Sequence, residues 1–494
     1  MSIKILFVYP NDYLNNGVPT GLSVLVSVLK QDGHIVSLFD YTFIKTQHPK
    51  IIKNPAVFLP TEYTIEDLVE NDPVQSIEEA FEKHLDSFQP DLICLSAMTC
   101  AFDAGIDLLT GFQSKIKCKV AVGGVHATIA PEDALKPDIV DLICVGEGEE
   151  FLLELCECIE KDTDYHHIRN LGYKIKDGIK INPLRPLINI DNLPMPDWSI
   201  FDQRHLFRPY MGNVYQGSFY VMSRGCSYRC AYCVNDPLQK QFRGCGKYYR
   251  FQNPQTTIRQ LKYLKEIYNA TWYKIADDSI MGFNTEYLEE LADGVSPLNI
   301  QFACSVRPET TSKKKVALLK SMGCVSMTIG VESGNEHLRK SVLNRKMTNK
   351  QIENALAIIK DYDIRPATFN MIGLPHETRE NVFETIQFNR KLEAKTSSVY
   401  IIYPYPGTEI SKKYNINYRD INGKIIHASK ASVFALSAMP PSEVDGLYKT
   451  FHLYLVLPEA LWPIIRYAEK NDKKGQDIYR SLAKYSESFQ LQAF

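Results

Sequence analysis

The sequence predicts an α/β protein: a doubly wound parallel sheet, then a partial or full βα barrel, then a small mixed C-terminal region. Short apolar runs alternate with segments of helical period in two series, one within residues 1–160 and one within 217–408. A stretch with repeated prolines, residues 161–212, separates the two series. Strands that alternate with helices form parallel sheets, because each helix packs back onto the sheet between two strands.

The first series should form the doubly wound sheet, with strands at 3–9, 34–40, 91–97, 119–124 and 141–147. Ligands of such sheets bind outside the carboxyl ends of the strands, where small residues let a ligand approach the backbone. The residues that follow those ends are therefore ligand-binding candidates: Pro10, Ser96, Thr99, Gly123, Gly124, Val125, His126, Gly146, Glu147 and Gly148.

The second series should form the barrel, with strands at 217–223, 272–279, 299–308, 325–334, 367–375 and 397–408. Active sites of such barrels lie at the carboxyl ends of the strands. Between the two series, Asp177-Gly178 predicts a hairpin that is followed by an extended linker. We therefore expect four units: 1–160, a hairpin and linker at 161–212, the barrel at 213–410, and a substrate-shaping region at 411–494.

Composition and charge exclude several classes of protein. The formal net charge is −2, so no global field attracts nucleic acid or anionic lipid. No apolar run is long enough for a membrane span, and MSIKILFVYP does not have the pattern of a signal peptide. We therefore expect a cytoplasmic protein whose 12 cysteines stay reduced, which favours metal-binding or catalytic roles over disulfides. Cys94, Cys118 and Cys144 lie within strand runs and are expected to fill space in the core.

One loop carries the strongest chemical signal. SRGCSYRCAYCVND, residues 223–236, places Cys226, Cys230 and Cys233 in a C-x3-C-x2-C pattern directly after the first barrel strand. Three thiolates on a short loop can hold three irons of a cubane cluster and leave the fourth iron open to a small molecule. The alternative is a zinc site with a fourth ligand elsewhere, for which Cys245 is the nearest candidate. Zinc sites favour paired Cys-x2-Cys units, and only one such unit is present here.

With Tyr232 before the last cysteine, this pattern resembles the radical S-adenosylmethionine (SAM) enzymes, over residues 217–410. The resemblance implies that Cys226, Cys230 and Cys233 hold a [4Fe–4S] cluster. SAM would chelate the open iron and be cleaved reductively to a 5′-deoxyadenosyl radical. A flavodoxin or ferredoxin would supply the electron.

The resemblance also implies which residues bind SAM. Candidates lie at the later strand ends, and each has a structural alternative such as a cap, an ion pair or a core position. Tyr232 could shield the cluster. The other candidates are Asp277, Asp278, Ser305, Arg307, Glu332, Arg345, Met371 and Gly373.

Residues 1–160 resemble the flavodoxin-like cobalamin-binding domains that precede some radical SAM barrels. The resemblance rests on PTGL at 19–22, GGVHATIAPED at 123–133 and GEGEEFLLEL at 146–155. One departure matters: the loop after the first strand reads YPNDYLNNG and lacks the D-x-H-x-x-G motif. The resemblance then implies cobalamin without a histidine below cobalt. We expect His126 to contact the cofactor rather than only its own loop, whereas Glu147 could face the ligand or start a helix.

Together these features predict a cobalamin-dependent radical SAM enzyme of the class B methyltransferase type, which methylates an unactivated carbon. A radical SAM cyclase, oxidase or rearrangement enzyme that transfers no methyl group is the first alternative. A zinc-stabilised binding protein without catalysis is the alternative from another class. We expect a monomer that acts on a small or lipid-like molecule.

Overall fold

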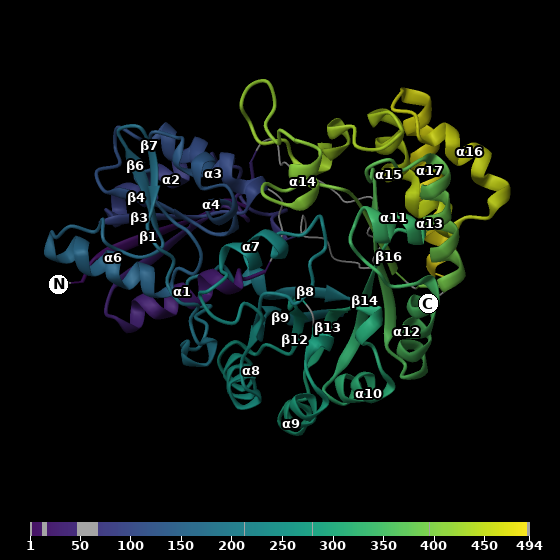
Figure 1. Ribbon diagram of the computed structural model, residues 1–494, viewed down its shortest axis with the longest axis horizontal. Coiled ribbons are helices and arrows are strands. Elements are labelled where there is room, and N and C mark those ends of the chain that lie inside the picture. The colour runs from purple at the N-terminus through teal and green to yellow at the C-terminus, as the bar shows by residue number, and fades with distance from the viewer. Residues whose placement is uncertain are drawn as a thin grey trace.

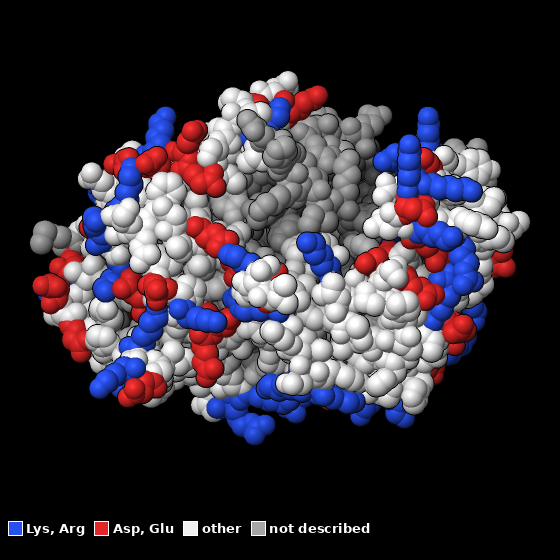
Figure 2. Space-filling model, turned by 90° about the horizontal axis from the view of Figure 1, so that it is seen from above, with Lys and Arg blue, Asp and Glu red and all other residues white. Residues whose placement is uncertain are grey.

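The computed structural model describes residues 2–11, 17–46, 68–211, 213–278, 280–394 and 396–491. Figure 1 shows a flat sheet at the N-terminal end, a strongly curved sheet beside it, and C-terminal helices against the far end of the curved sheet. Charged side chains of both signs are interspersed on the face seen in Figure 2, in keeping with the small net charge.

The N-terminal sheet has the strand order β2-β1-β3-β4-β5-β6-β7. The first five of these strands are parallel, and β6 and β7 are antiparallel. This order puts the topological switch point, where ligands of doubly wound sheets bind, between β1 and β3. The predicted fold class of this unit is confirmed. The strands are β1 (Lys4–Tyr9), β2 (Ile35–Asp40), β3 (Leu92–Ser96), β4 (Lys119–Gly123), β5 (Leu142–Cys144), β6 (Leu171–Ile175) and β7 (Gly178–Ile181).

Helices cover both faces of this sheet because successive strand residues point to opposite sides. Ile5 and Phe7 pack in one core with residues of α1 and α6, whereas Leu6 and Val8 pack in another with residues of α2 and α3. Cys94 and Cys144 are buried within the first of these cores, as expected for space-filling cysteines. The helices are α1 (Thr20–Gln31), α2 (Ile77–Phe88), α3 (Thr99–Gly111), α4 (Val125–Ile129), α5 (Pro131–Leu135) and α6 (Glu149–Lys161).

The predicted hairpin is present, but it belongs to the first sheet rather than to a separate linker. Its strand β6 pairs with β5 and covers an edge that would otherwise expose unpaired backbone groups. The linker then passes through two 3₁₀ turns, η2 (Ile190–Asn192) and η3 (Gln203–Leu206), into β8 (Phe207–Tyr210).

The curved sheet is a partial barrel, in agreement with the prediction. Its order is β16-β15-β14-β13-β12-β9-β8, so it ends in two free edges and does not close. The six strands from β9 to β16 are parallel, and β8 is antiparallel to β9. The parallel strands are β9 (Asn213–Tyr220), β12 (Trp272–Ile275), β13 (Gln301–Val306), β14 (Cys324–Glu332), β15 (Arg365–Ile372) and β16 (Thr396–Ile401).

Helices line the outside of this curve in Figure 1. Side-chain caps start most of them; Thr348 and Gln351, for example, form a capping box at the start of α12. The crossover helices are α8 (Pro254–Tyr268), α9 (Thr285–Val295), α10 (Lys313–Ser321), α12 (Asn349–Asp361) and α13 (Arg379–Leu392), with the 3₁₀ turns η4 (Ile280–Gly282), η5 (Ser296–Leu298) and η6 (Pro308–Thr310). Shorter elements at the carboxyl ends of the strands are β10 (Ser223–Arg224), β11 (Arg250–Phe251), α7 (Asn235–Gln241) and α11 (Glu336–Ser341).

The C-terminal region packs on the last part of the barrel. Leu447 and Phe451 of α15 and Ile465 of α16 share a core with Val382 of α13, so the apolar segment 451–467 is a packed helix pair. The elements are α14 (Glu409–Lys413), η7 (Ala428–Phe434), α15 (Pro441–Val456), η8 (Glu459–Leu461), α16 (Trp462–Ala468) and α17 (Lys473–Leu491). Of the helices in the described ranges, none has the length and apolar character that a membrane crossing requires.

Candidate active site

The cysteine loop begins where β9 ends, as predicted. Gly225, directly before Cys226, has a φ of +81°, and a Cβ there would lie 2.7 Å from the carbonyl oxygen of Tyr248. Glycine is therefore required at the start of the loop. The N–H of Cys233 donates to the carbonyl of Cys230 at 3.0 Å, which closes the loop on itself.

The loop is also held from both sides. The N–H of Ala231 donates to the carbonyl of Leu343 at 3.0 Å, and the N–H of Ile410 donates to the carbonyl of Ala231 at 3.1 Å. Cys226 and Cys230 are buried, and Cys233 is half-buried. The three thiols influence one another electrostatically, and burial raises the pKa of Cys226 to about 11.

Cationic side chains are directed at the sulfur of Cys230. Nη1 of Arg307 lies 3.3 Å from this sulfur and Nη1 of Arg345 lies 3.8 Å from it. The Nε atoms of both guanidiniums are buried and have no hydrogen-bond partner among the residues that the structure describes. Asn235 Nδ2 lies 3.5 Å from Cys233 Sγ. This surrounding fits a cluster of net negative charge better than it fits three neutral thiols.

The zinc alternative would need one ion shared by four side chains. Among the described residues, no group of three or more His, Cys, Asp or Glu side chains is placed to hold a single metal ion. A cubane does not require such a group, because each cysteine binds a different iron.

Three of the SAM candidates form one network beside Cys230. The Tyr232 hydroxyl donates to Oε1 of Glu332 at 3.0 Å, and Nη1 of Arg345 lies 3.3 Å from that hydroxyl and 3.5 Å from the same carboxylate oxygen. Burial and the neighbouring Glu332 raise the pKa of Tyr232 well above its usual value. Glu332 has a φ of +66°, an uncommon conformation for a residue with a Cβ that is often found at functional sites.

The two adjacent aspartates have different surroundings. Oδ2 of Asp277 accepts from the N–H of Met222 at 3.0 Å, and Oδ1 accepts from the hydroxyl of Ser223. Burial raises the pKa of Asp277 to about 7 in spite of these bonds. Asp277 thus supports the entry to the cysteine loop, whereas Asp278 faces the cavity described below.

The remaining SAM candidates lie on or just after the barrel strands. Ser305, on β13, is half-buried and stands in register with Thr328 of β14. Met371 is buried in a small apolar cluster with Ala231 and Tyr232. The N–H of Gly373 donates to Oε2 of Glu377 at 2.7 Å.

A cavity of about 530 Å³ lies between the carboxyl edge of the first sheet and the cysteine loop. The cavity is lined by seven of the ten residues that we expected, from the sequence, to bind a ligand at this edge. Pro10, Thr99 and His126 are not part of its lining. From the first sheet it is lined by Ser96, Gly123, Gly124, Val125, Gly146, Glu147 and Gly148, and from the barrel side by Val221, Arg224, Gly225, Asn235, Tyr248, Ala276 and Asp278, among others.

His126 lies behind this edge and is fully buried. Its Nδ1 lies 3.3 Å from the hydroxyl of Thr99, its Nε2 lies 3.2 Å from Oδ2 of Asp133, and its ring packs on Phe102 at 4.3 Å between centroids. The cofactor contact that we expected of His126 would have to be indirect, through the preceding Gly124 and Val125.

Glu147 joins the two halves of the protein. Its carboxylate accepts from Arg224 at 2.8 Å, from Arg250 at 2.5 Å and from the N–H of Ile188 at 3.0 Å. Arg224 also pairs with Glu149. Burial alone would raise the pKa of Glu147, but the two arginines outweigh burial and lower it.

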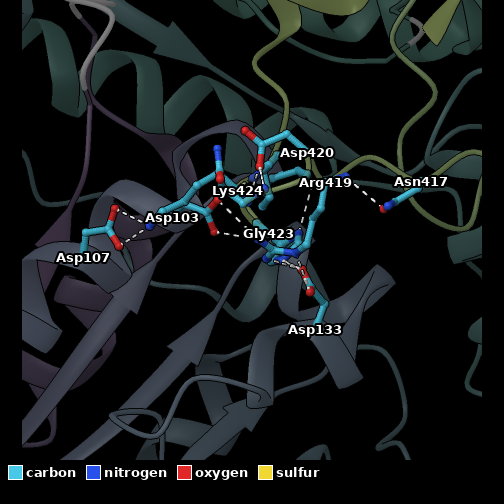
Figure 3. A network of polar contacts seen from close by, with 12 residues as sticks. Asp103, Asp107, Asp133, Asn417, Arg419, Asp420, Gly423 and Lys424 are labelled. Carbon is cyan, nitrogen blue, oxygen red and sulfur yellow. Dashed lines mark hydrogen bonds and ion pairs between the residues drawn. The ribbon is translucent and has the colours of Figure 1, made fainter. Parts of the chain in front are cut away.

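A second contact between the halves was not foreseen from sequence. The segment 417–425, which we call the strap, follows α14 and reaches the helices of the first sheet (Figure 3). Arg419 forms two hydrogen bonds with Asp133, at 2.6 and 2.7 Å, and also contacts Asp103 at 3.2 Å. Lys424 pairs with Asp107 nearby. Asp133 contacts His126, which directly follows the cavity-lining residues Gly124 and Val125. The strap is therefore connected to this part of the cavity wall through Asp133 and His126.

Two family descriptions match this architecture. Residues 11–156 match the B12 binding domain, and residues 220–388 match the radical SAM superfamily. The chain thus contains a B12-binding domain followed by a radical SAM domain. The first match spans strands β2 to β5 of the flat sheet, and the second spans strands β12 to β15 of the curved sheet.

The names of the relatives of this chain give more than one reaction. An uncharacterized methyltransferase of Pyrococcus horikoshii is 27% identical over 66% of this chain and 70% of its own length. The anaerobic magnesium-protoporphyrin IX monomethyl ester cyclase of Rubrivivax gelatinosus is 21% identical over 83% of this chain and 69% of its own length.

Two solved radical SAM structures share the fold. The methyltransferase TsrM from Kitasatospora setae, with cobalamin and a [4Fe-4S] cluster bound, aligns with a TM-score of 0.62 at 16% identity, over 84% of this chain and 75% of its own. OxsB, with aqua-cobalamin and SAM bound, aligns with a TM-score of 0.66 at 16% identity, over 99% of this chain and 72% of its own.

Proposed function

We propose that this protein is a cobalamin-dependent radical SAM methyltransferase that methylates an unactivated carbon. One observation carries the proposal: a single cavity is lined both by Gly124 and Gly146, at the sheet edge, and by Gly225, which precedes Cys226. The iron–sulfur cluster with its SAM and the cobalamin, which the family implies, would therefore face the same cavity. The methyltransferases among the relatives support transfer of a methyl group as the reaction.

The chain offers a defined set of residues for the cluster and SAM. When bound, the cluster and SAM would supply hydrogen-atom abstraction from an unactivated carbon, and cobalamin would supply the methyl group. In this proposal Cys226, Cys230 and Cys233 hold the cluster, and Arg307 and Arg345 compensate its charge. Tyr232, Asp278, Ser305, Glu332, Met371 and Gly373 hold SAM, with Asp277 as a positioning residue beneath the loop.

For cobalamin we propose the seven cavity-lining edge residues, with Pro10, Thr99 and His126 as a supporting layer. We also propose that no histidine binds cobalt from below. The loop after β1 has no histidine, although its residues 12–16 lie outside the described ranges. His205, near this edge, is engaged through both ring nitrogens: it accepts from the N–H of Gly17 and lies 2.5 Å from Oδ2 of Asp40. His126 is buried against Thr99 and Asp133, away from the cavity.

The proposal is tested by anaerobic reconstitution with iron, sulfide and hydroxocobalamin. The wild type should show iron–sulfur absorption, retain one cobalamin after gel filtration, and transfer label from methyl-labelled SAM to a small molecule. Cys230→Ala should lose the iron–sulfur absorption, whereas the matched variant Cys245→Ala should keep it. Loss of absorption in both variants, or a stoichiometric zinc ion without iron, would contradict the cluster assignment.

The lower-ligand proposal has its own readout. In the cob(II)alamin state, a coordinating histidine would split the electron paramagnetic resonance lines through its nitrogen. We expect no such splitting, and its presence would contradict the proposal.

A cyclase, oxidase or rearrangement activity is the second candidate, because a cyclase is among the relatives. Formation of 5′-deoxyadenosine with substrate, without labelled methyl in the product, would favour it over methyl transfer. As partners we propose a flavodoxin or ferredoxin as electron donor. We further propose a monomer in the cytoplasm, with the barrel at 213–410, a substrate pocket shaped by residues 411–494, and a first domain at 1–160 whose sheet the hairpin after residue 160 extends.

A further inference from the structure

The inner face of the curved sheet carries positive charge below its rim. Lys274 of β12 stands in register with Phe219 of β9 on one side and Ala303 of β13 on the other. Its sequence neighbours Tyr273 and Ile275 belong to the core that packs under the outer helices. Because side chains alternate along a strand, Lys274 and Phe219 point to the inner face together.

Among the described residues, none serves as a counterion for Lys274. It is half-buried, and within the described part of the chain it makes no hydrogen bond or ion pair. Burial lowers its pKa, and the titratable groups that act on it are the thiols of Cys304 and Cys324 rather than a carboxylate. The acidic candidates of this face, Asp278 and Glu332, lie at the rim. A lysine in such a place destabilises the fold unless something pairs with it.

A second cation flanks the same aromatic ring. The guanidinium carbon of Arg208, on β8, lies 5.2 Å from the centre of Phe219. Arg208 is 8% exposed, and its hydrogen bonds to described residues go to neutral oxygens, the carbonyl of Phe207 at 3.3 Å and the hydroxyl of Ser218 at 3.4 Å. Its Nε is buried without a partner, and burial lowers its pKa to about 10.

The cavity lining comes within two residues of Lys274 and Phe219 along the chain. Ala276 directly follows β12, two residues after Lys274, and Val221 directly follows β9, two residues after Phe219; both line the cavity, and Ala276 is exposed. On the neighbouring strand β13, Ala303 pairs with Lys274, and Ser305 lies two residues further along and is also small. A molecule that lies between the cysteine loop and the sheet edge can therefore extend down the inner face toward Lys274.

We propose that Lys274 and Arg208 bind an anionic group of the substrate, a carboxylate or a phosphate, beside the ring of Phe219. Ammonium and guanidinium groups form their strongest hydrogen bonds with these anions. The ring provides an apolar surface for the atoms next to the anion. The inference rests on the proposed function in one respect, namely that the substrate occupies this cavity.

The experiment measures binding to the reconstituted holoenzyme by isothermal titration calorimetry. The probes are 2-naphthoate, 2-naphthyl phosphate and the neutral analogue 2-naphthamide. Lys274→Met and Arg208→Met should each weaken binding of the preferred anion by about tenfold or more, equivalent to the loss of one charge-assisted contact. Binding of 2-naphthamide should stay unchanged. The probe that binds more tightly to the wild type tells carboxylate from phosphate.

Two controls keep the result decisive. Lys262→Met removes an exposed lysine from α8 and should leave all three affinities unchanged, whereas Lys274→Arg keeps the charge and should retain most anion affinity. Cluster absorption shows whether each variant is folded. Equal affinity of wild type and Lys274→Met for both anions, or equal weakening of anion and amide, would overturn the inference. The methyl-transfer assay is separate: anion binding without methyl transfer would refute the proposed function and leave this site standing.

Discussion

Arg224 and Glu147 are joined by a hydrogen bond of 2.8 Å that connects the two halves of the protein at the cavity. Arg224 precedes Gly225-Cys226, and Glu147 lies between Gly146 and Gly148. One ion pair therefore links the start of the cysteine loop to the proposed cobalamin edge. Together with the pairs Arg250–Glu147, Arg224–Glu149 and Arg419–Asp133, this ion pair holds the two halves against each other.

Glu147→Gln should destabilise the protein. The amide keeps the shape of the carboxylate but removes the charge that compensates Arg224 and Arg250, which are both largely buried. We expect the free energy of unfolding to fall by about 2 kcal/mol, as for other charged hydrogen bonds that lose one partner. Urea unfolding followed by tryptophan fluorescence measures it. Glu157→Gln, which removes an exposed pair with Lys161, is the control and should change little. Equal effects of the two variants would contradict the assignment.

Arg419→Met should weaken cobalamin binding although Arg419 is not part of the described cavity lining. Without Arg419, Asp133 loses its ion pair with an arginine and keeps its contact with His126, so the segment that presents Gly124 and Val125 can relax. We expect the dissociation constant for hydroxocobalamin to rise about tenfold, which corresponds to ~1.4 kcal/mol. Spectrophotometric titration of the apoprotein measures it.

Lys424→Met is the matched control for this variant. It removes another cation of the strap, but its pair with Asp107 is half-exposed on both sides. An equal loss of cobalamin affinity in Lys424→Met would show that the strap acts as a whole and not through Asp133.

Arg307→Leu should make the reduction potential of the cluster more negative. The guanidinium lies 3.3 Å from Cys230 Sγ, and reduction adds an electron to an already anionic group, which a nearby cation favours. A redox titration followed by electron paramagnetic resonance, without SAM, measures the potential. Arg229→Leu removes a cation from the same loop that is directed at Gln239 instead, and it should leave the potential nearly unchanged. A potential that rises in Arg307→Leu would contradict this prediction.

The sequence was sufficient to predict strands and the cysteine loop because both depend on local patterns. Apolar runs mark buried parallel strands, and the cysteine spacing is contained within eight residues. Side-chain direction at a strand end is different, since it depends on the elements packed around it. Asp277 and Asp278 are neighbours in sequence, yet Asp277 bonds the backbone of Met222, between β9 and β10, and Asp278 faces the cavity.

Contacts between segments that are far apart in the sequence could likewise not be predicted from the sequence. Arg419 and Asp133 are 286 positions apart, and no local pattern around Arg419 indicates that it pairs with Asp133. His126 follows a glycine pair at a strand end, which suggested a ligand contact. The structure turns it toward Thr99 and Asp133, because the short helix α4 begins at Val125 and points the next side chain into the core.

Glu377→Gln should remove a pH dependence of stability. Glu377 is fully buried; its Oε2 accepts from the N–H groups of Gly373 and Leu374, while Oε1 has no partner. Burial raises its pKa from 4.5 to about 8. The folded state therefore holds this proton where the unfolded chain releases it, so wild-type stability is lost as pH rises from 4.5 to about 8, by on the order of 1 kcal/mol per pH unit. The amide oxygen can accept from the same two N–H groups without titrating, so the variant should lack this loss.

Urea unfolding of both proteins across this range measures the difference, with Glu290→Gln on the outer helix α9 as the control. Parallel pH profiles for wild type and Glu377→Gln would contradict this prediction, because they would show that the buried carboxyl of Glu377 carries no proton at neutral pH.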